Sequence, residues 1–179
     1  MQLHGFQGTR PDKVIQQLGI TKGALYHYFP GKKELGYAVV EEVIEKNFLG
    51  AWRQIDDFEG NPIDFIKLHL DYLYNINGKE TVCLGCPLNN LIQEMSPLDE
   101  GFRTRLKRIV EGMAHHIEKA LRKGQNEGIL VPDFNTKEMA YFIVSSIEGS
   151  FGIAKVHQDQ SLFKASLDNL GRFLETLKK

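Results

Sequence analysis

Two cysteines three residues apart carry the most reactive side chains of this 179-residue chain. Cys83 and Cys86 form a C-x-x-C motif just before an expected helix, in which Pro87 takes a first-turn position. Because the helix dipole stabilises a thiolate at such a position, one interpretation is a thiol that senses oxidants or electrophiles. The other interpretation is a pair of inert or pocket-lining side chains, and we favour this one.

Neither a metal site nor an enzyme is expected around these cysteines. A structural zinc ion requires two further ligands, and the adjacent His115 and His116 face different ways on a helix. A thioredoxin-like enzyme requires a neighbouring βαβ pattern, which the sequence lacks. The sequence also has no nucleophile–base constellation, phosphate-binding glycine loop or paired-carboxylate motif. We therefore expect no catalysis, no metal and no cofactor.

A second group of polar and aromatic residues lies on a short helical pair near the N-terminus, over residues 9–29. Gly19 permits a tight turn, Thr21 is placed to cap the second helix, and Leu25 points inward. The outer face of that helix is small, basic and aromatic, which suits approach to base edges and phosphates in a DNA major groove. The predicted DNA-binding residues are Thr21, Lys22, Gly23, Ala24, Tyr26, His27, Tyr28 and Lys32. The alternative is a helical hairpin whose aromatic residues only cover the core.

The run GITKGALYHYFPGKKEL, residues 19–35, resembles the signature that ends the DNA-binding domain of the TetR family of bacterial transcriptional regulators. The matching positions are Gly19, Thr21, Lys22, Gly23, Leu25, Tyr26, Phe29, Lys32 and Leu35. The resemblance implies a helix-turn-helix DNA-binding domain over residues 1–32 and a helical effector-binding and dimerisation domain over residues 33–179. It also implies a homodimeric repressor that a small-molecule effector releases from a palindromic, double-stranded operator.

Two features depart from the family pattern. The chain begins inside the family's first helix, of which LHGFQGT is only the end, and Pro11 stands where the family has an aliphatic residue. One competing hypothesis is therefore a helical ligand-binding or oligomeric protein that has lost DNA binding. Another is a thiol-based redox-sensing regulator that uses Cys83 and Cys86.

The elements that position these residues are predicted to be helices throughout, because apolar residues recur mostly at intervals of three and four. The fold class is thus all-α, with an N-terminal helix-turn-helix head on a helical body. The expected helices span about 11–17, 21–28, 33–56, 62–76, 87–95, 98–126, 136–156 and 160–177. No apolar run approaches the roughly 18 residues that cross a bilayer, and no secretory leader opens the chain. We expect a cytoplasmic protein with no membrane contact.

The last two expected helices carry the dimer prediction. The final helix has a heptad-like apolar stripe over about two repeats, and the helix before it is rich in small residues. A helix buried inside one chain would show much the same stripe. In the TetR family these two helices form a four-helix interface, so the resemblance assigns a homodimer interface to Phe151, Leu167, Leu170 and Leu174.

The middle helices mix apolar and polar residues that are able to line a cavity. The predicted ligand pocket consists of Phe65, His69, Tyr72, Asn89, Met113, His116, Phe142 and Ser146. Each of these residues also suits a plain core position. Because this region encloses the effector pocket in the family, we expect a small, partly apolar ligand, with its effect transmitted through helices 98–126 and 33–56 to the head.

Charge is divided unevenly along the chain, although the formal net charge is only −1. Residues 1–35 hold five basic and two acidic side chains, whereas the rest holds 17 basic and 21 acidic side chains. A basic head on an acidic body is the distribution expected if only one end meets DNA.

Overall fold

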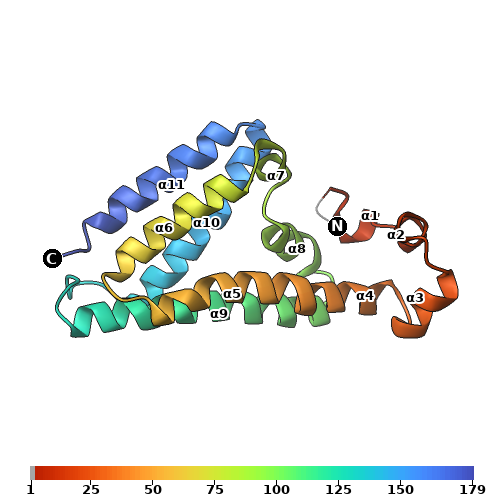
Figure 1. Ribbon diagram of the computed structural model, residues 1–179, viewed down its shortest axis with the longest axis horizontal. Helices are drawn as coiled ribbons and strands as arrows, with labels where there is room; N and C mark the ends of the chain where they lie inside the picture. Colours follow the sequence, from red (N-terminus) through yellow and green to blue (C-terminus); the bar gives the residue numbers. More distant parts are fainter. Residues whose placement is uncertain (1–2) are drawn as a thin grey trace.

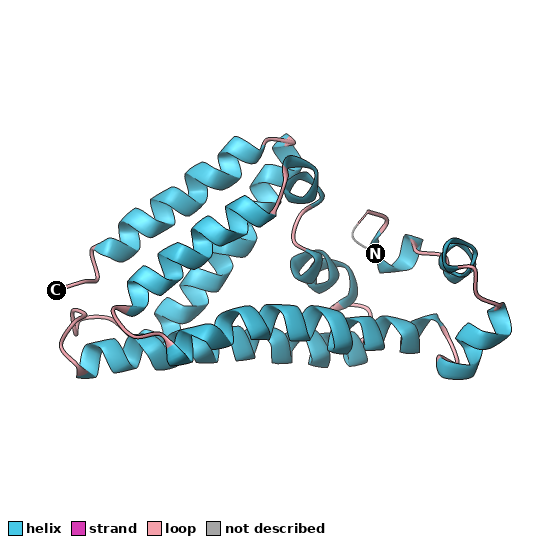
Figure 2. Ribbon diagram, in the orientation of Figure 1, coloured by secondary structure: helices cyan, strands magenta, loops and turns pink. Residues whose placement is uncertain are grey.

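The computed structural model describes residues 3–179 and consists of helices joined by short loops (Figure 2). The helices are α1 (Gly5–Gly8), α2 (Pro11–Leu18), α3 (Lys22–Tyr28), α4 (Lys32–Val39), η1 (Val40–Glu45), α5 (Lys46–Arg53), η2 (Gln54–Asp57), α6 (Pro62–Ile76), α7 (Lys79–Leu84), α8 (Pro87–Met95), α9 (Glu100–Asn126), α10 (Thr136–His157) and α11 (Gln160–Glu175). The only β-type pairing among the described residues is an isolated bridge between Leu130 and Lys178. The all-α prediction is therefore confirmed.

One long helical rod joins the two ends of the molecule. The predicted helix 33–56 is built from α4, η1, α5 and η2 in direct succession, and it lies alongside α9 (Figure 1). The segment η1 is a π-helix, in which the backbone winds more widely than in the α-helices on either side. The head formed by α1, α2 and α3 lies at one end of this rod, and α6, α10 and α11 lie toward the other (Figure 1). The rod is thus a continuous connection between head and body.

The helices begin where the sequence supplies caps. The Thr21 hydroxyl accepts a hydrogen bond from the Ala24 N–H at 3.1 Å and caps α3. Gly19 ends α2 in the left-handed conformation, with φ of 65°. Asp99 caps α9 by accepting from the Phe102 N–H at 2.9 Å. These local signals explain why the helix boundaries agree closely with the predicted ones.

Two short helices were missing from the helices expected from apolar spacing: α7, and α1, which only the family resemblance indicated as the end of a first helix. Each has six residues or fewer, which is too short to show a helical repeat of apolar residues. The helix α7 includes the first cysteine of the C-x-x-C motif and is followed by Gly85 as its C-cap, whose φ is 82°. It places Cys83 inside a helix and Cys86 at the N-cap of α8.

The body is held together by the helix α10, which packs between α9 and α11, and by α6, which packs on α11. The apolar stripe of the last helix faces this core: Leu167, Leu170 and Leu174 are 3%, 6% and 0% exposed. Phe151 of α10 is also buried, and its ring lies 4.3 Å from that of Phe163. This corrects the predicted dimer interface, because these four side chains are already covered by their own chain.

The head contacts the body through an aromatic cluster. Phe6 of α1 lies 4.7 Å from the Phe102 ring of α9, and Tyr37 of α4 lies 4.9 Å from it on an edge-to-face approach. The Glu94 carboxylate of α8 accepts hydrogen bonds from the N–H groups of Phe6 at 2.6 Å and Gln7 at 2.8 Å. Both the rod and α8 therefore hold the head in place.

A glycine allows this cluster to close. A Cβ atom on Gly36 would lie 2.5 Å from the Phe6 ring and 2.7 Å from the Phe102 ring. We expect Gly36→Ala to destabilise the protein by about 1–3 kcal/mol through overpacking, measured by chemical denaturation. The matched control is Gly50→Ala in α5, whose added Cβ meets no atom within 4 Å. That control should be neutral or stabilising by about 0.5–1 kcal/mol, and equal losses in both variants would contradict the packing argument.

Candidate nucleic-acid interface and ligand cavity

The second helix of the head presents the predicted DNA-binding residues to solvent. In α3, Leu25 is buried, whereas Tyr26 is 36% and Tyr28 is 77% exposed. The other predicted residues on α3 and at its N-cap are also exposed: Thr21, Lys22, Gly23, Ala24 and His27. A Cβ atom added to Gly23 would have only the Thr21 hydroxyl oxygen within 4 Å, at 4.0 Å. The N-terminal end of α3 is therefore open to close approach by a partner.

The Lys22 ammonium on this surface is held by a solvent-exposed ion pair. Lys22 pairs with Asp12 at 3.1 Å, and its ammonium lies 5.8 Å from the centre of the Tyr26 ring. Both members of the ion pair are well exposed, so the pair contributes little to stability and a phosphate is able to replace Asp12. The pair raises the pKa of Lys22, chiefly through the hydrogen bond to Asp12.

Lys32 differs from the other predicted DNA-binding residues. Its ammonium donates to the Gln7 carbonyl at 2.8 Å and lies 4.9 Å from the centre of the Phe6 ring. The residue is partly buried against α1, but its hydrogen bond to Gln7 is exposed to solvent. Its role as a phosphate contact stays a prediction.

The body contains an aromatic-walled cavity of about 430 Å³. Its walls come from α5, α6, α7 with the loop that follows, α8, α9 and α10. The lining residues are Asn47, Phe48, Ala51, Trp52, His69, Tyr72, Leu73, Ile76, Asn77, Thr81, Gly85, Cys86, Pro87, Met113, Ile147, Glu148 and Phe151. Its volume and mixed lining match those of small-molecule sites in proteins.

Three titratable side chains in the cavity wall have pKa values shifted by burial. Burial lowers the pKa of His69 to about 4, and its ring packs 4.3 Å from that of Trp52. Burial raises the pKa of Glu148 to about 7. Burial, and next the negative charge of Glu148, raise the pKa of the Cys86 thiol well above its usual range. Near neutral pH the histidine and the thiol are therefore uncharged, and Glu148 titrates.

Of the eight predicted pocket residues, His69, Tyr72 and Met113 line this cavity. The other five do not, which corrects their assignment, because each is used elsewhere. The ring of Phe65 packs against Phe58, and His116 lies 2.9 Å from an Asp56 oxygen. The Asn89 side-chain amide donates to the Glu148 carbonyl, and the Ser146 hydroxyl donates to the Phe142 carbonyl. The Phe142 ring is 46% exposed and packs against the Phe173 ring.

Glu148 is the main cavity residue that the sequence interpretation missed. Apart from Glu138 in the first turn, it is the only acidic residue in α10. A lone carboxylate among Ile147, Phe151 and other apolar residues was the available signal. Trp52 and Phe48 were missed because α5 looked like a connecting helix rather than a cavity wall.

The two cysteines are both free and buried. Cys86 lines the cavity, whereas the Cys83 carbonyl accepts a hydrogen bond from Gln158 at 3.0 Å. Although Cys86 is at a helix N-cap, burial outweighs the helix dipole and disfavours its thiolate. Among the described residues, no three His, Cys, Asp or Glu side chains are grouped so as to hold a metal ion.

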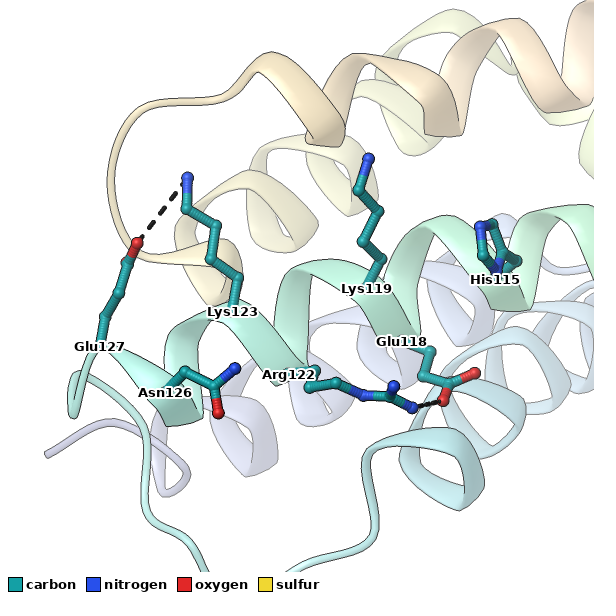
Figure 3. A pocket seen from close by; sticks show the side chains of 7 residues that line it. All are labelled: His115, Glu118, Lys119, Arg122, Lys123, Asn126 and Glu127. Atoms are coloured by element: carbon teal, nitrogen blue, oxygen red, sulfur yellow. Dashed lines mark hydrogen bonds and ion pairs between the residues drawn. The ribbon is translucent and has the colours of Figure 1, made fainter.

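A second hollow of about 430 Å³ runs along the outer side of α9 (Figure 3). Its long charged side chains extend from one helix, and they lie beside partners of opposite charge: Arg122 pairs with Glu118, and Lys123 lies 3.9 Å from Glu127. The hollow is open and largely charge-compensated, with no apolar floor from another helix. It is a solvated helix face and is a poor candidate for an effector site.

The outer side of α10 and α11 carries exposed apolar residues. Phe142, Ile153 and Val156 share one face of α10, and Phe173 of α11 lies edge-on to Phe142 with ring centres 5.4 Å apart. Gly149 belongs to the same face, and a Cβ there would meet no atom. An apolar face with small residues is typical of a helix-packing interface.

The open α3 surface on a helical body with an internal cavity defines the class of protein, a helix-turn-helix transcriptional regulator that binds DNA. Residues 1–39 match the family of bacterial regulatory proteins called tetR, and residues 66–170 match the family described as the tetracyclin repressor-like C-terminal domain. The chain belongs to the TetR family of transcriptional regulators. The family prediction and the prediction of a DNA-binding regulator are thereby confirmed.

Individual relatives agree with this placement. An uncharacterised HTH-type transcriptional regulator from Lactococcus lactis subsp. lactis is 30% identical over 169 residues, which cover 93% of this chain and 83% of the relative. The repressor DhaR of Mycobacterium sp. (strain GP1) is 23% identical over 157 residues, or 87% of this chain and 77% of that protein. Two crystal structures share the fold. The regulatory protein TetR from Rhodobacter sphaeroides has a TM-score of 0.83 and 24% identity, and the match covers 96% of this chain and 90% of that one. Reduced NemR from E. coli has a TM-score of 0.80 and 21% identity, and the match covers 97% of this chain and 88% of NemR.

No described helix is long and apolar enough to cross a membrane.

Proposed function

We propose that this regulator is a ligand-responsive repressor that acts in the cytoplasm by binding alone, without catalysis. Residues 1–32 contact the operator, and residues 33–179 bind the effector and a second copy of the chain. The single observation that carries the proposal is the open N-terminal end of α3, with Thr21, Lys22 and Tyr26 exposed around Gly23. The repressor role is supported by the printed description of DhaR as a transcriptional repressor.

Dimerisation supplies the geometry for operator recognition. Two copies related by a two-fold axis place two α3 helices in successive major grooves about one helical turn apart, which matches a palindromic site. We assign the interface to the exposed apolar face of α10 and α11 defined by Phe142, Ile153, Val156 and Phe173.

A variant of this face tests the assignment. We expect Phe142→Glu to raise the dimer dissociation constant by at least about 100-fold, because two-fold symmetry buries the new carboxylate twice without a partner. Sedimentation velocity across a concentration series measures the change. Leu98→Glu is the matched control, since Leu98 is 63% exposed in the loop before α9. A dimer that tolerates Phe142→Glu as well as the control contradicts the interface.

The effector signal has a direct physical route. Phe48 and Trp52 of α5 line the cavity, and the same rod continues through η1 and α4 into the head. A second route runs through α8, which has Cys86 at its cavity end and Glu94 at the head. A ligand that moves either helix changes the spacing of the two α3 helices, so it favours a dimer with lower DNA affinity.

The experiment that tests the proposed function is a mobility-shift assay with the DNA upstream of the protein's own gene. The repressor hypothesis expects retardation that weakens steeply as the salt concentration rises. A protein that has lost DNA binding retards no fragment even at low salt, and that result would overturn the proposal.

A further inference from the structure

The cavity contains the carboxyl group of Glu148, which is hydrogen-bonded to the Cys86 thiol but has one oxygen without a partner among the described residues. Oε2 of Glu148 is shielded from solvent and has no hydrogen-bond partner among the described residues. A buried acceptor without a partner is costly, and such groups occur where a ligand completes the site. Glu148 lines the cavity wall, so a bound molecule is placed to reach it.

The rest of the cavity wall is suited to a positive charge. Its aromatic side chains include Phe48, Trp52, Tyr72 and Phe151, whose ring faces attract cations. No lysine or arginine is among the lining residues. Lys155 passes beside Gly85, and its ammonium donates to Asn90 Oδ1 at 2.9 Å. The wall therefore contains an acceptor and π-faces but no fixed cation.

We propose that the effector is an organic cation, a quaternary ammonium or protonated amine with an apolar body, whose charge lies at the Glu148 carboxylate and whose body contacts Trp52 and the neighbouring rings. The ionised form of Glu148 disfavours an anionic effector, because the lining residues include no lysine or arginine to compensate the charge. The effect of the ligand on DNA rests on the proposed function, whereas its binding does not.

Protonation gives the cation proposal a distinctive signature. The Cys86 thiol, at the N-cap of α8, is hydrogen-bonded to the Glu148 carboxyl, and the other titratable groups of the cavity wall are His69 and Tyr72 of α6. Lys155, on the same helix as Glu148, is paired with Asn90. Burial places the pKa of Glu148 at about 7, so the carboxylate is mostly protonated at pH 6 and mostly ionised at pH 8. Affinity for a quaternary ammonium, which itself does not titrate, should rise by about tenfold over that interval.

Trp52 provides the measurement, because it is the only tryptophan in the chain and it lines the cavity. The probes are benzyltrimethylammonium and its uncharged carbon isostere, neopentylbenzene, titrated against Trp52 fluorescence. We expect the cation to bind at least tenfold more tightly than the isostere at pH 8. Equal affinities for the two probes would overturn the proposal.

Variants separate charge recognition from simple loss of folding. Glu148→Gln keeps the shape of the side chain and should remove the preference for the cation together with the pH dependence of cation binding. The matched control Glu138→Gln lies in the exposed first turn of the same helix and should keep the preference and the pH dependence. Tyr72→Leu should weaken the cation more than the isostere, because it removes a ring face and leaves an apolar wall. A cation preference that survives Glu148→Gln would refute the site. Binding without any change in DNA retardation would leave the ligand class standing and overturn only the release mechanism.

Discussion

Lys22→Ala and Tyr26→Ala are each expected to weaken operator binding by about tenfold to a hundredfold. Both side chains extend from the exposed face of α3, where they are placed to contact phosphates, and each is present twice in a dimer. For Lys22→Ala the loss should be similar on all DNA sequences, and the slope of log K against log salt should become shallower by about 2. Mobility-shift titrations at several salt concentrations measure both quantities.

Lys119→Ala is the matched control for these variants. Lys119 is similarly exposed, at 59% against 66% for Lys22, but it lies on α9 in the hollow of Figure 3 and outside the predicted DNA-binding residues. It should bind DNA like the parent protein, and all three variants should remain dimers. Unchanged DNA binding by both Lys22→Ala and Tyr26→Ala would refute the contact assignment of α3.

The second large effect concerns Glu148 and the stability of the fold. Burial raises the pKa of this group from its usual 4.5 to about 7 in the folded chain. The stability that it contributes is therefore fully present below about pH 4.5, where both states are protonated, and is lost as the pH rises toward 7. Above pH 7 the folded protein contains a buried carboxylate without a hydrogen-bond partner on Oε2.

Glu148→Gln should remove this pH dependence. Relative to the parent, the variant should gain stability between pH 5 and pH 8 by about 1–3 kcal/mol, on the order of 1.4 kcal/mol per pKa unit. Urea unfolding at the two pH values gives the difference, and Glu138→Gln should show no such gain. A parallel pH profile for parent and Glu148→Gln would contradict the raised pKa of the buried carboxyl group.

Local signals in the sequence were enough to predict the head. Gly19 and Thr21 mark the turn and the cap, and the buried Leu25 then fixes which face of α3 is exposed. The contact of Lys32 with the Gln7 carbonyl was not predicted, because it joins residues 25 positions apart. No spacing pattern within one helix reports such a contact.

The body was predicted well as a set of helices and poorly as a site. The stripe with Leu167 and Leu170 looks the same whether it packs on a second chain or on its own core, and only the structure distinguishes the two. The cavity is formed where α5, α6, α8 and α10 converge, so its lining depends on how the helices cross. Of the predicted residues, His69 lies on the wall, whereas Phe65, one turn away on the same helix, packs against Phe58.

The π-helical segment η1, Val40–Glu45, sets how the faces of α4 are rotated about the helix axis relative to the cavity-lining face of α5. Each residue of an α-helix turns the chain by about 100°, so a wider turn shifts the faces of α4 relative to those of α5. If η1 tightened into an α-helix, the faces of α4 would rotate about the rod axis relative to Phe48 and Trp52. A small change in winding at one turn is thus geometrically equivalent to a rotation of the DNA-binding surface.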